Sequence, residues 1–401
     1  MANLSTRLDA LRATIEKLMS IGGTPGLSLG VMHQGRQVYY AAYGHSDVEK
    51  GLPITDETVL PVCSMTEAVT SAALGILMEE NKANWDTLIK DALPSFNIND
   101  DILQNNLTIT DLLCHRSGKS WGDNLFVGTE NNILISEKDS MKYINSQTRL
   151  LHFCGQLSYN NMGFELAGKV IEALSGQSYF DFLQTRIFDP LGMDRTFLQT
   201  PPSSLEDIGT TYNALDDGCS VRIPAVKAGD DWFGTPSAGM RSCVGQLVLE
   251  EFIQAPDVER NDYLKAAESS RAENLKWYPS LMHELAQERK YDTSAKPLEE
   301  YVCTYWDAIH VFKIDVVLKE GQLYWLLQGL ESEKFLLNNY EDDLFTWLLP
   351  RNELSKRGRW VGGDEGPDFW KAVFKTGDGG KIDKLSWSHD NGIAAVEYKK
   401  G

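Results

Sequence analysis

The sequence predicts an α/β domain, with helices flanking an antiparallel sheet, followed by a smaller all-β domain. Up to about residue 255, short strand-like runs alternate with segments whose apolar residues recur at helical spacing. Beyond Tyr301 the residue pattern changes to short runs of strand-forming residues at regular intervals, which is typical of an antiparallel sandwich or a small lipocalin-like barrel. A chain of 401 residues also exceeds what one hydrophobic core usually fills.

We therefore divide the chain into an α/β domain over 1–255, a helical linker over 256–298 and an all-β domain over 299–401. The linker segment is charged, lacks glycine and has few apolar residues before Tyr278. Such a composition is typical of an exposed helix or helical hairpin.

Net charge, hydropathy and cysteine spacing limit the partners, the location and the cofactors that we expect. The formal net charge is −19, and lysine/arginine stripes are absent, which argues against nucleic acid and anionic membranes as partners. The N-terminus has no signal-type apolar core and no run is long enough to span a bilayer, so we expect a cytoplasmic protein. Six scattered cysteines show no metal-ligand spacing, and phosphate-binding glycine loops are absent, so neither a metal nor a cofactor is expected.

The first elements are predicted to be a helix and a hairpin. Residues 6–19 carry apolar side chains at helical spacing, and the glycine-rich stretch 22–26 ends that helix. Leu27–Met32 and Gln37–Ala42 resemble strands, and His33–Arg36 between them is a hairpin signal.

The stretch Leu60–Glu80 carries the first candidate chemistry. A short extended run turns at Ser64 into a helix that is apolar on nearly all sides and is therefore predicted to be buried. Glu67 lies one turn later on the same face. Two interpretations stay open: a capping box, in which Ser64 caps and Glu67 reaches back, or a catalytic pair. Cys63 is a rival nucleophile, but it ends an apolar run and is expected to be a buried small residue.

Polar residues also gather at three later places. A loop containing His115 follows a short predicted helix, and Tyr159-Asn-Asn161 precedes a helix predicted over Phe164–Leu174. A Pro- and Asp-rich irregular segment over 200–236 contains Trp232, whose side chain is a candidate to line the substrate pocket. Ala238–Ser242, which follows it, is expected to open another helix.

Seven strands are expected after the linker, and six tryptophans in that region are expected to be core aromatics rather than ligand contacts. His310 and His389 are interpreted as incidental. The expected strands are Val302–Trp306, His310–Val317, Leu323–Gln328, Leu344–Leu349, Phe369–Phe374, Ile382–Trp387 and Ile393–Tyr398.

In order and spacing, five motifs together resemble the serine β-lactamase and penicillin-binding-protein-like family over roughly residues 5–250. The resemblance is to its esterase and transacylase branch, which includes fungal members of biosynthetic pathways, and the C-terminal region resembles the small β domain appended to many such proteins. The motifs are Ser64-Met-Thr-Glu67, His115-Arg-Ser-Gly118, Tyr159-Asn-Asn161, Phe188-Asp-Pro-Leu-Gly-Met193 and Ala238-Gly-Met-Arg-Ser242.

The resemblance implies roles for individual residues. In the family, the serine of Ser-x-x-Lys is the nucleophile, the lysine helps to deprotonate it, and the tyrosine of Tyr-x-Asn relays the proton. By resemblance Ser64 is the nucleophile, Tyr159 the relay and Asn161 a substrate-orienting or relay amide. His115 lies in a loop that often borders the serine pocket in the family, and we expect it to brace that loop by hydrogen bonds rather than act as a general base. Here Glu67 replaces the lysine: a desolvated carboxylate can act as a base but cannot supply positive charge.

The family's third motif, Lys-Thr-Gly or His-x-Gly, is missing from its usual place, because Val244–Phe252 passes at once into what resembles the closing helix. The first domain is therefore expected to be truncated. Lys375-Thr-Gly377 matches the missing triplet, yet its surroundings predict a hairpin turn. An open sheet edge favours pairing with a second copy, so a homodimer is one expectation.

Three functional hypotheses follow, of which we favour an enzyme acting on a small molecule. The first is a serine hydrolase or acyltransferase acting on an ester, lactone or thioester of a small, secondary-type metabolite through Ser64. The second is an acid/base isomerase, lyase or cyclase that uses Glu67 and Tyr159 in the same pocket. The third is a non-catalytic binding relative, which the lost lysine and missing segment support.

Overall fold

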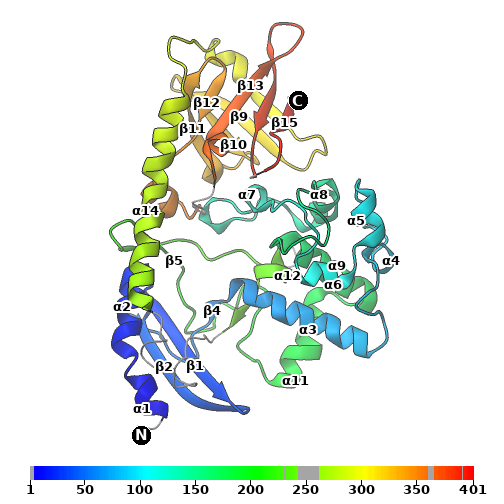
Figure 1. The fold of residues 1–401 in the computed structure, drawn as a ribbon, viewed down its shortest axis with the longest axis vertical. Coiled ribbons are helices and arrows are strands. Elements are labelled where there is room, and N and C mark those ends of the chain that lie inside the picture. The colour runs from blue at the N-terminus through cyan, green and yellow to red at the C-terminus, as the bar shows by residue number, and fades with distance from the viewer. Residues whose placement is uncertain (1–3, 230–231, 243–261, 360–364, 391) are drawn as a thin grey trace.

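The computed structural model describes residues 4–229, 232–242, 262–359, 365–390 and 392–401. It contains an α/β part, a long helix α14 (Tyr263–Glu288) that runs along one side, and a closed β-barrel (Figure 1). The predicted fold class, a β-lactamase-like α/β domain with a C-terminal all-β domain, is confirmed. No described helix is both long and apolar enough to cross a membrane.

The described part of the first sheet has three antiparallel strands in the order β1-β2-β3: β1 (Gly26–His33), β2 (Arg36–Asp47) and β3 (Leu52–Pro53). The predicted hairpin is confirmed, since Gln34 and Gly35 join β1 to β2 with φ of 48° and 73°, as a two-residue turn between twisted strands requires. Helices α1 (Leu4–Asp9) and α2 (Arg12–Gly22) bury Leu8 and Ile15 against this sheet.

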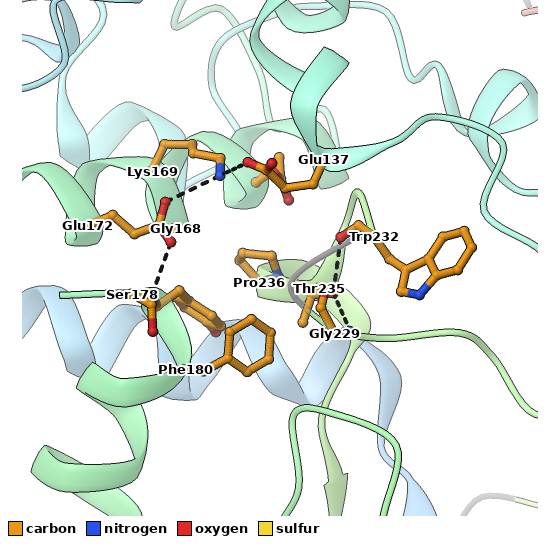
Figure 2. A pocket seen from close by; sticks show the side chains of 12 residues that line it. Glu137, Gly168, Lys169, Glu172, Ser178, Phe180, Gly229, Trp232, Thr235 and Pro236 are labelled. Atoms are coloured by element: carbon orange, nitrogen blue, oxygen red, sulfur yellow. Dashed lines mark hydrogen bonds and ion pairs between the residues drawn. The ribbon is translucent and has the colours of Figure 1, made fainter.

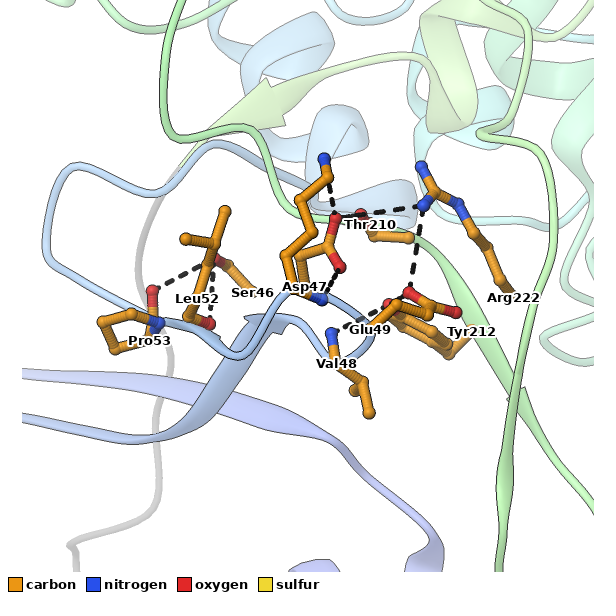
Figure 3. A network of polar contacts seen from close by, with 10 residues as sticks. Ser46, Asp47, Val48, Glu49, Leu52, Pro53, Thr210, Tyr212 and Arg222 are labelled. Carbon is orange, nitrogen blue, oxygen red and sulfur yellow. Dashed lines mark hydrogen bonds and ion pairs between the residues drawn. The ribbon is translucent and has the colours of Figure 1, made fainter.

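A network of polar contacts fixes the far end of β2 to residues 210–222 (Figure 3). The Val48 N–H donates to the Tyr212 hydroxyl over 2.9 Å, and the Arg222 guanidinium lies 3.9 Å from Asp47 and 3.8 Å from Glu49. Residues 212–222 form the small hairpin of β5 (Tyr212–Ala214) and β6 (Ser220–Arg222). These contacts join the β1-β2-β3 sheet to the irregular segment 200–236 that the sequence predicted.

Two buried helices form the centre of the α/β part. They are α3 (Thr66–Glu79) and α9 (Asn161–Ser175), and both pack against α12 (Thr235–Ala238). A Cβ at Gly168 would lie 2.4 Å from the Pro236 ring, so only glycine allows α12 to pack this closely on α9. The other helices around them are α4 (Ile89–Ala92), α5 (Asp101–Asn106), α6 (Ile109–Leu113), α7 (Asp123–Phe126), α8 (Ser140–Ser146), α10 (Tyr179–Leu183) and α11 (Asp189–Leu191).

The expectation that Ala238–Ser242 opens a helix is wrong. Helix α12 ends at Ala238, and the chain then forms β7 (Arg241–Ser242), which pairs antiparallel with β4 (Leu60–Pro61). The Val62 N–H also donates to the Met240 carbonyl over 3.0 Å. This pairing places the segment beside the chain that leads into Ser64. The predicted closing-helix segment Val244–Phe252 lies outside the described residues.

Eight antiparallel strands close the C-terminal barrel in the order β10-β11-β12-β13-β14-β15-β8-β9. The sequence missed β11, whose two consecutive asparagines, Asn338 and Asn339, interrupt its alternation of buried residues. The strands are β8 (Cys303–Trp306), β9 (Lys313–Lys319), β10 (Gln322–Leu327), β11 (Lys334–Glu341), β12 (Leu344–Thr346), β13 (Lys371–Thr376), β14 (Ile382–Trp387) and β15 (Val396–Lys400), with helix α15 (Arg351–Lys356) after β12.

Aromatic side chains fill the barrel. Trp325, Trp347, Trp370 and Trp387 are fully buried, with ring centroids 4.6 to 5.9 Å apart in the contacting pairs. The indole N–H groups of Trp347 and Trp387 both donate to the Phe369 carbonyl. The prediction that tryptophans form the core here is confirmed for these four.

The barrel is fastened to the α/β part by buried polar contacts. The Glu333 carboxylate, on a barrel loop, accepts hydrogen bonds from the Thr129 backbone and hydroxyl and lies 3.5 Å from the Arg359 guanidinium. Arg359 in turn donates to the Asn124 carbonyl over 3.3 Å. Because Glu333 and Arg359 are 0 % and 3 % exposed, these contacts are shielded from solvent.

Candidate active site

The turn that precedes α3 presents Ser64 to solvent. Cys63, Ser64 and Met65 form one turn of 3₁₀ helix, and Cys63 adopts a left-handed φ of 46°, an uncommon conformation for a non-glycine residue. Ser64 is exposed, and so is Cys63, so the expectation of a buried Cys63 is wrong. Among the described residues the Ser64 backbone N–H has no hydrogen-bond partner.

Neither Ser64 nor Glu67 caps helix α3. Neither the 3₁₀ turn nor α3 has a side-chain cap, which makes the capping-box interpretation wrong. The buried Thr66 hydroxyl instead donates to the Cys63 carbonyl over 2.6 Å and accepts from the Met240 N–H over 3.0 Å. Thr66 thus fixes the turn that presents Ser64.

Ser64, Tyr159 and Glu67 are linked by short hydrogen bonds. The Tyr159 hydroxyl lies 2.7 Å from Ser64 Oγ and 2.8 Å from Glu67 Oε1. Both contacts have the geometry of a Tyr159 O–H donor, and a phenol has one proton, so Tyr159 donates to either the Glu67 carboxylate or Ser64 Oγ at a given moment. The Tyr159 hydroxyl thus stands between the Ser64 hydroxyl and a carboxylate.

Burial, together with the hydrogen bond to Glu67, raises the pKa of Tyr159 to about 12. The Ser64 hydroxyl opposes this shift but does not cancel it. Tyr159 therefore stays protonated near neutral pH and can pass a proton only by giving up its own at the same time. Within this cluster the Glu67 carboxylate is the group that accepts a hydrogen bond from the Tyr159 hydroxyl.

His115 holds Glu67 from the other side. Its Nδ1 accepts a hydrogen bond from the Asn160 N–H over 3.1 Å, so the neutral ring carries its proton on Nε2. His115 Nε2 lies 3.4 Å from Glu67 Oε2, and the His115 and Tyr159 rings are 4.5 Å apart. His115 and Glu67 are only 11 % and 13 % exposed. The predicted bracing role of His115 thus extends to the carboxylate itself.

Asn160 and Asn161 begin helix α9, three residues earlier than predicted. The buried Asn160 caps the helix by accepting from the Gly163 N–H over 2.9 Å, and its amide donates to the Ser120 carbonyl. The Asn161 amide donates to Asp123 Oδ2 over 2.7 Å. These bonds fix the backbone on either side of Tyr159 and His115.

The sequence missed a second pair of acidic residues behind Asn161. Burial raises the pKa of Asp123 to about 7, and the charges of Asp390 and Glu67 act in the same direction. Asp390, on the barrel loop after β14, accepts a hydrogen bond from the Gly122 N–H over 2.8 Å. Burial lowers the pKa of the neighbouring His389 to about 4, so it stays neutral at pH 7.

The structure brings together four of the six predicted site residues, Ser64, Glu67, Tyr159 and His115, whereas the Asn161 amide is bonded to Asp123. Trp232 lines a different cavity, described below. Lys375 lies in β13 and Gly377 begins the predicted turn between β13 and β14, while the Lys375 ammonium pairs with Glu397 on β15 over 2.7 Å. The turn precedes β14, whereas Asp390, which accepts the Gly122 N–H, follows the opposite end of β14.

Two family models and several known proteins match parts of this chain. The model of the Beta-lactamase family matches residues 11–273, and a model of a domain of unknown function, DUF3471, matches residues 287–399. The chain is 30 % identical over 199 residues to the unguisins hydrolase ungD' of Aspergillus campestris, covering 48 % of this chain and 36 % of that protein. It is 27 % identical over 198 residues to penicillin-binding protein 4 of Amycolatopsis lactamdurans, covering 49 % and 48 %.

The chain thus spans about half or less of these curated relatives. Among solved structures, the octameric penicillin-binding protein homologue from Pyrococcus abyssi matches with a TM-score of 0.53 and 16 % identity, over 98 % of this chain and 100 % of that one. At this identity the match supports the fold alone, and it extends across both parts of the chain.

Proposed function

Because this chain belongs to the Beta-lactamase family, we propose that it is a serine hydrolase or acyltransferase that forms an acyl-Ser64 intermediate with an ester, lactone or thioester of a small metabolite. The observation that carries the proposal is the hydrogen-bonded chain from Ser64 through Tyr159 to Glu67. A serine hydroxyl is a weak nucleophile until a neighbouring group takes its proton. Here the acceptor is a carboxylate two hydrogen bonds away.

In the proposed mechanism Ser64 Oγ attacks the acyl carbonyl. Its proton passes to Tyr159 while the Tyr159 proton passes to Glu67, so that neither hydroxyl has to ionise alone. The unpartnered Ser64 N–H supports the carbonyl oxygen as it becomes negative. When the carbon–oxygen or carbon–sulfur bond to the leaving group breaks, the proton returns along the same path.

The acyl group then leaves Ser64 in a second, equivalent step. Water attacks the acyl ester in a hydrolase, whereas an alcohol or amine attacks it in an acyltransferase, and Tyr159 with Glu67 accepts the proton of either. The name of the Aspergillus relative, a hydrolase, supports the first of these outcomes.

The test is acylation of the intact protein. Incubation with a fluorophosphonate or 4-nitrophenyl acetate, followed by mass spectrometry, should show one adduct that maps to Ser64. Ser64→Ala should abolish it, whereas Ser71→Ala, a serine one turn beyond Glu67 on the same helix, and Cys63→Ala should retain it. An adduct on Cys63 alone, or none under any condition, would contradict the proposal.

The same contacts support a second candidate, an acid/base enzyme without a covalent step. Tyr159 is a protonated acid, with a pKa raised to about 12, in direct contact with the carboxylate of Glu67. Under that reading Ser64→Ala keeps turnover of the true substrate, while Tyr159→Phe and Glu67→Gln each lose it. Measurement of turnover in the three variants separates the two candidates.

A further inference from the structure

A cavity lies behind α9, away from the Ser64 cluster, by which we mean Ser64, Glu67, Tyr159 and His115. None of these four residues lines the cavity. Its volume is about 240 Å³, and it lies between α9, α10 and α12 (Figure 2). Three carboxylates and one ammonium line it, those of Glu137, Glu165, Glu172 and Lys169. This composition is unusual for a filled core, where charged groups are paired one to one.

Lys169 is already engaged at the rim of the cavity. Its ammonium pairs with Glu137 and lies 3.2 Å from Glu172, and Figure 2 shows it between these two carboxylates. Glu172 also accepts the Tyr179 N–H over 3.1 Å. Glu137 and Glu172 are 37 % and 34 % exposed, so both face solvent as well.

Glu165 is the one of the three carboxylates for which the described residues form no ion pair within 4 Å, because Lys169 pairs with Glu137 and Glu172 and reaches Glu165 only through its longer-range charge. It is 2 % exposed, and its Oε2 accepts the Gly234 N–H over 3.0 Å. Its other oxygen has no hydrogen-bond partner within the described part of the chain, although the residue lines the cavity. Burial raises the pKa of Glu165 to about 7, and the charge of Lys169 and the Gly234 hydrogen bond offset this shift only in part.

The remaining lining combines the hydroxyl-bearing Ser178, Tyr179 and Thr235 with an apolar part. The side chains of Phe180 and Pro236 face the cavity opposite Lys169 and Glu172, whereas the Trp232 indole points away from them (Figure 2). Trp232 is instead in contact with the Lys227 ammonium, 4.9 Å from its ring centroid. A ligand here would meet negative charge on one side and hydrocarbon on the other.

We propose that this cavity binds a small primary ammonium with a short apolar body. The ammonium would occupy the free oxygen of Glu165 and the apolar part would pack on Phe180 and Pro236. An ammonium offers three donors and fits a carboxylate set that lacks donors, whereas an anion would meet two more carboxylates than ammonium groups. The volume suits a molecule smaller than the usual drug-sized ligand.

The probe for the test is 2-phenylethylamine, with 2-phenylethanol as its neutral isostere, and binding is measured by isothermal titration calorimetry. The amine should bind at least roughly tenfold more tightly than the alcohol, and Glu165→Gln should remove that preference. Near pH 7 the amine should also displace a proton from Glu165, seen as a dependence of the binding heat on the buffer's ionisation enthalpy.

Two further variants protect the test against misfolding. Lys169→Met removes the competing ammonium and should tighten amine binding, an effect opposite to that of Glu165→Gln, while Glu353→Gln on the barrel surface should change nothing. Equal binding of amine and alcohol, unchanged binding in a folded Glu165→Gln protein, or no amine binding at millimolar concentration would each overturn the proposal.

Discussion

Glu67→Gln is the sharpest test of the proton path, because the amide keeps the size of the side chain and can still accept the Tyr159 hydrogen bond. With a pKa of about 12, only about one Tyr159 side chain in 10⁵ is ionised at pH 7. Tyr159 alone therefore cannot serve as the base. Removal of Glu67 as the acceptor should slow acylation of Ser64 by about 10²–10⁴-fold.

The assay is single-turnover acylation by 4-nitrophenyl acetate, followed by release of nitrophenolate and by intact mass. Glu79→Gln, an exposed glutamate at the other end of α3, is the matched control and should acylate at the rate of the unmodified protein. Tyr159→Phe should slow acylation to a similar extent as Glu67→Gln.

A relay also predicts how the two changes combine. If Tyr159 and Glu67 act as one unit, the double variant should be little slower than either single variant, because each already interrupts the path. Effects that multiply would show that the two residues act independently. A Glu67→Gln protein with normal acylation would refute the assignment of Glu67 as the base.

Three other predictions concern charge at the site and at the interface. Glu67→Lys should raise hydrolysis of 4-nitrophenyl acetate, because an ammonium beside Tyr159 lowers the pKa of that hydroxyl. Glu333→Ala should lower the free energy of unfolding by about 3–5 kcal/mol in urea titrations, because it removes the carboxylate that lies 3.5 Å from the buried Arg359 guanidinium. The pKa of His389 is about 4 in the folded protein and near 6.5 in the unfolded chain, so its contribution to stability is lost as pH falls from about 6.5 to 4. His389→Gln should flatten that part of the melting-temperature profile, and an unchanged profile would contradict the assignment.

The sequence could predict the Ser64 cluster because each member belongs to a local pattern. Ser64 and Glu67 share one face of a helix start, and Tyr159 precedes a second helix start, so the two polar helix ends could be expected to meet. The same reasoning failed at Cys63, because a left-handed φ turns that residue outward and no local pattern signals such a turn.

Contacts between distant segments could not be predicted in this way. Asp390 meets Gly122 across 268 positions of sequence, and Glu333 meets Thr129 across 204. Each is an ordinary acidic residue in a loop, and only the docking of the barrel buries it. Met240 and Arg241 were expected to be helical, yet pairing with Leu60 and Pro61 decides their conformation, since a two-residue bridge carries no periodicity.

In the proposed mechanism Glu67, at the position where the family's motif has lysine, is the group that holds the proton between the two halves of the reaction. A lysine favours deprotonated neighbours through its charge, whereas Glu67 favours protonated ones, and together with burial, the larger cause, it raises the pKa of Tyr159. Chemistry then requires that Glu67 stay within reach of Tyr159 and out of bulk water. The His115 contact and 13 % exposure meet both conditions, so the same carboxylate can take the Ser64 proton and return it to the leaving group.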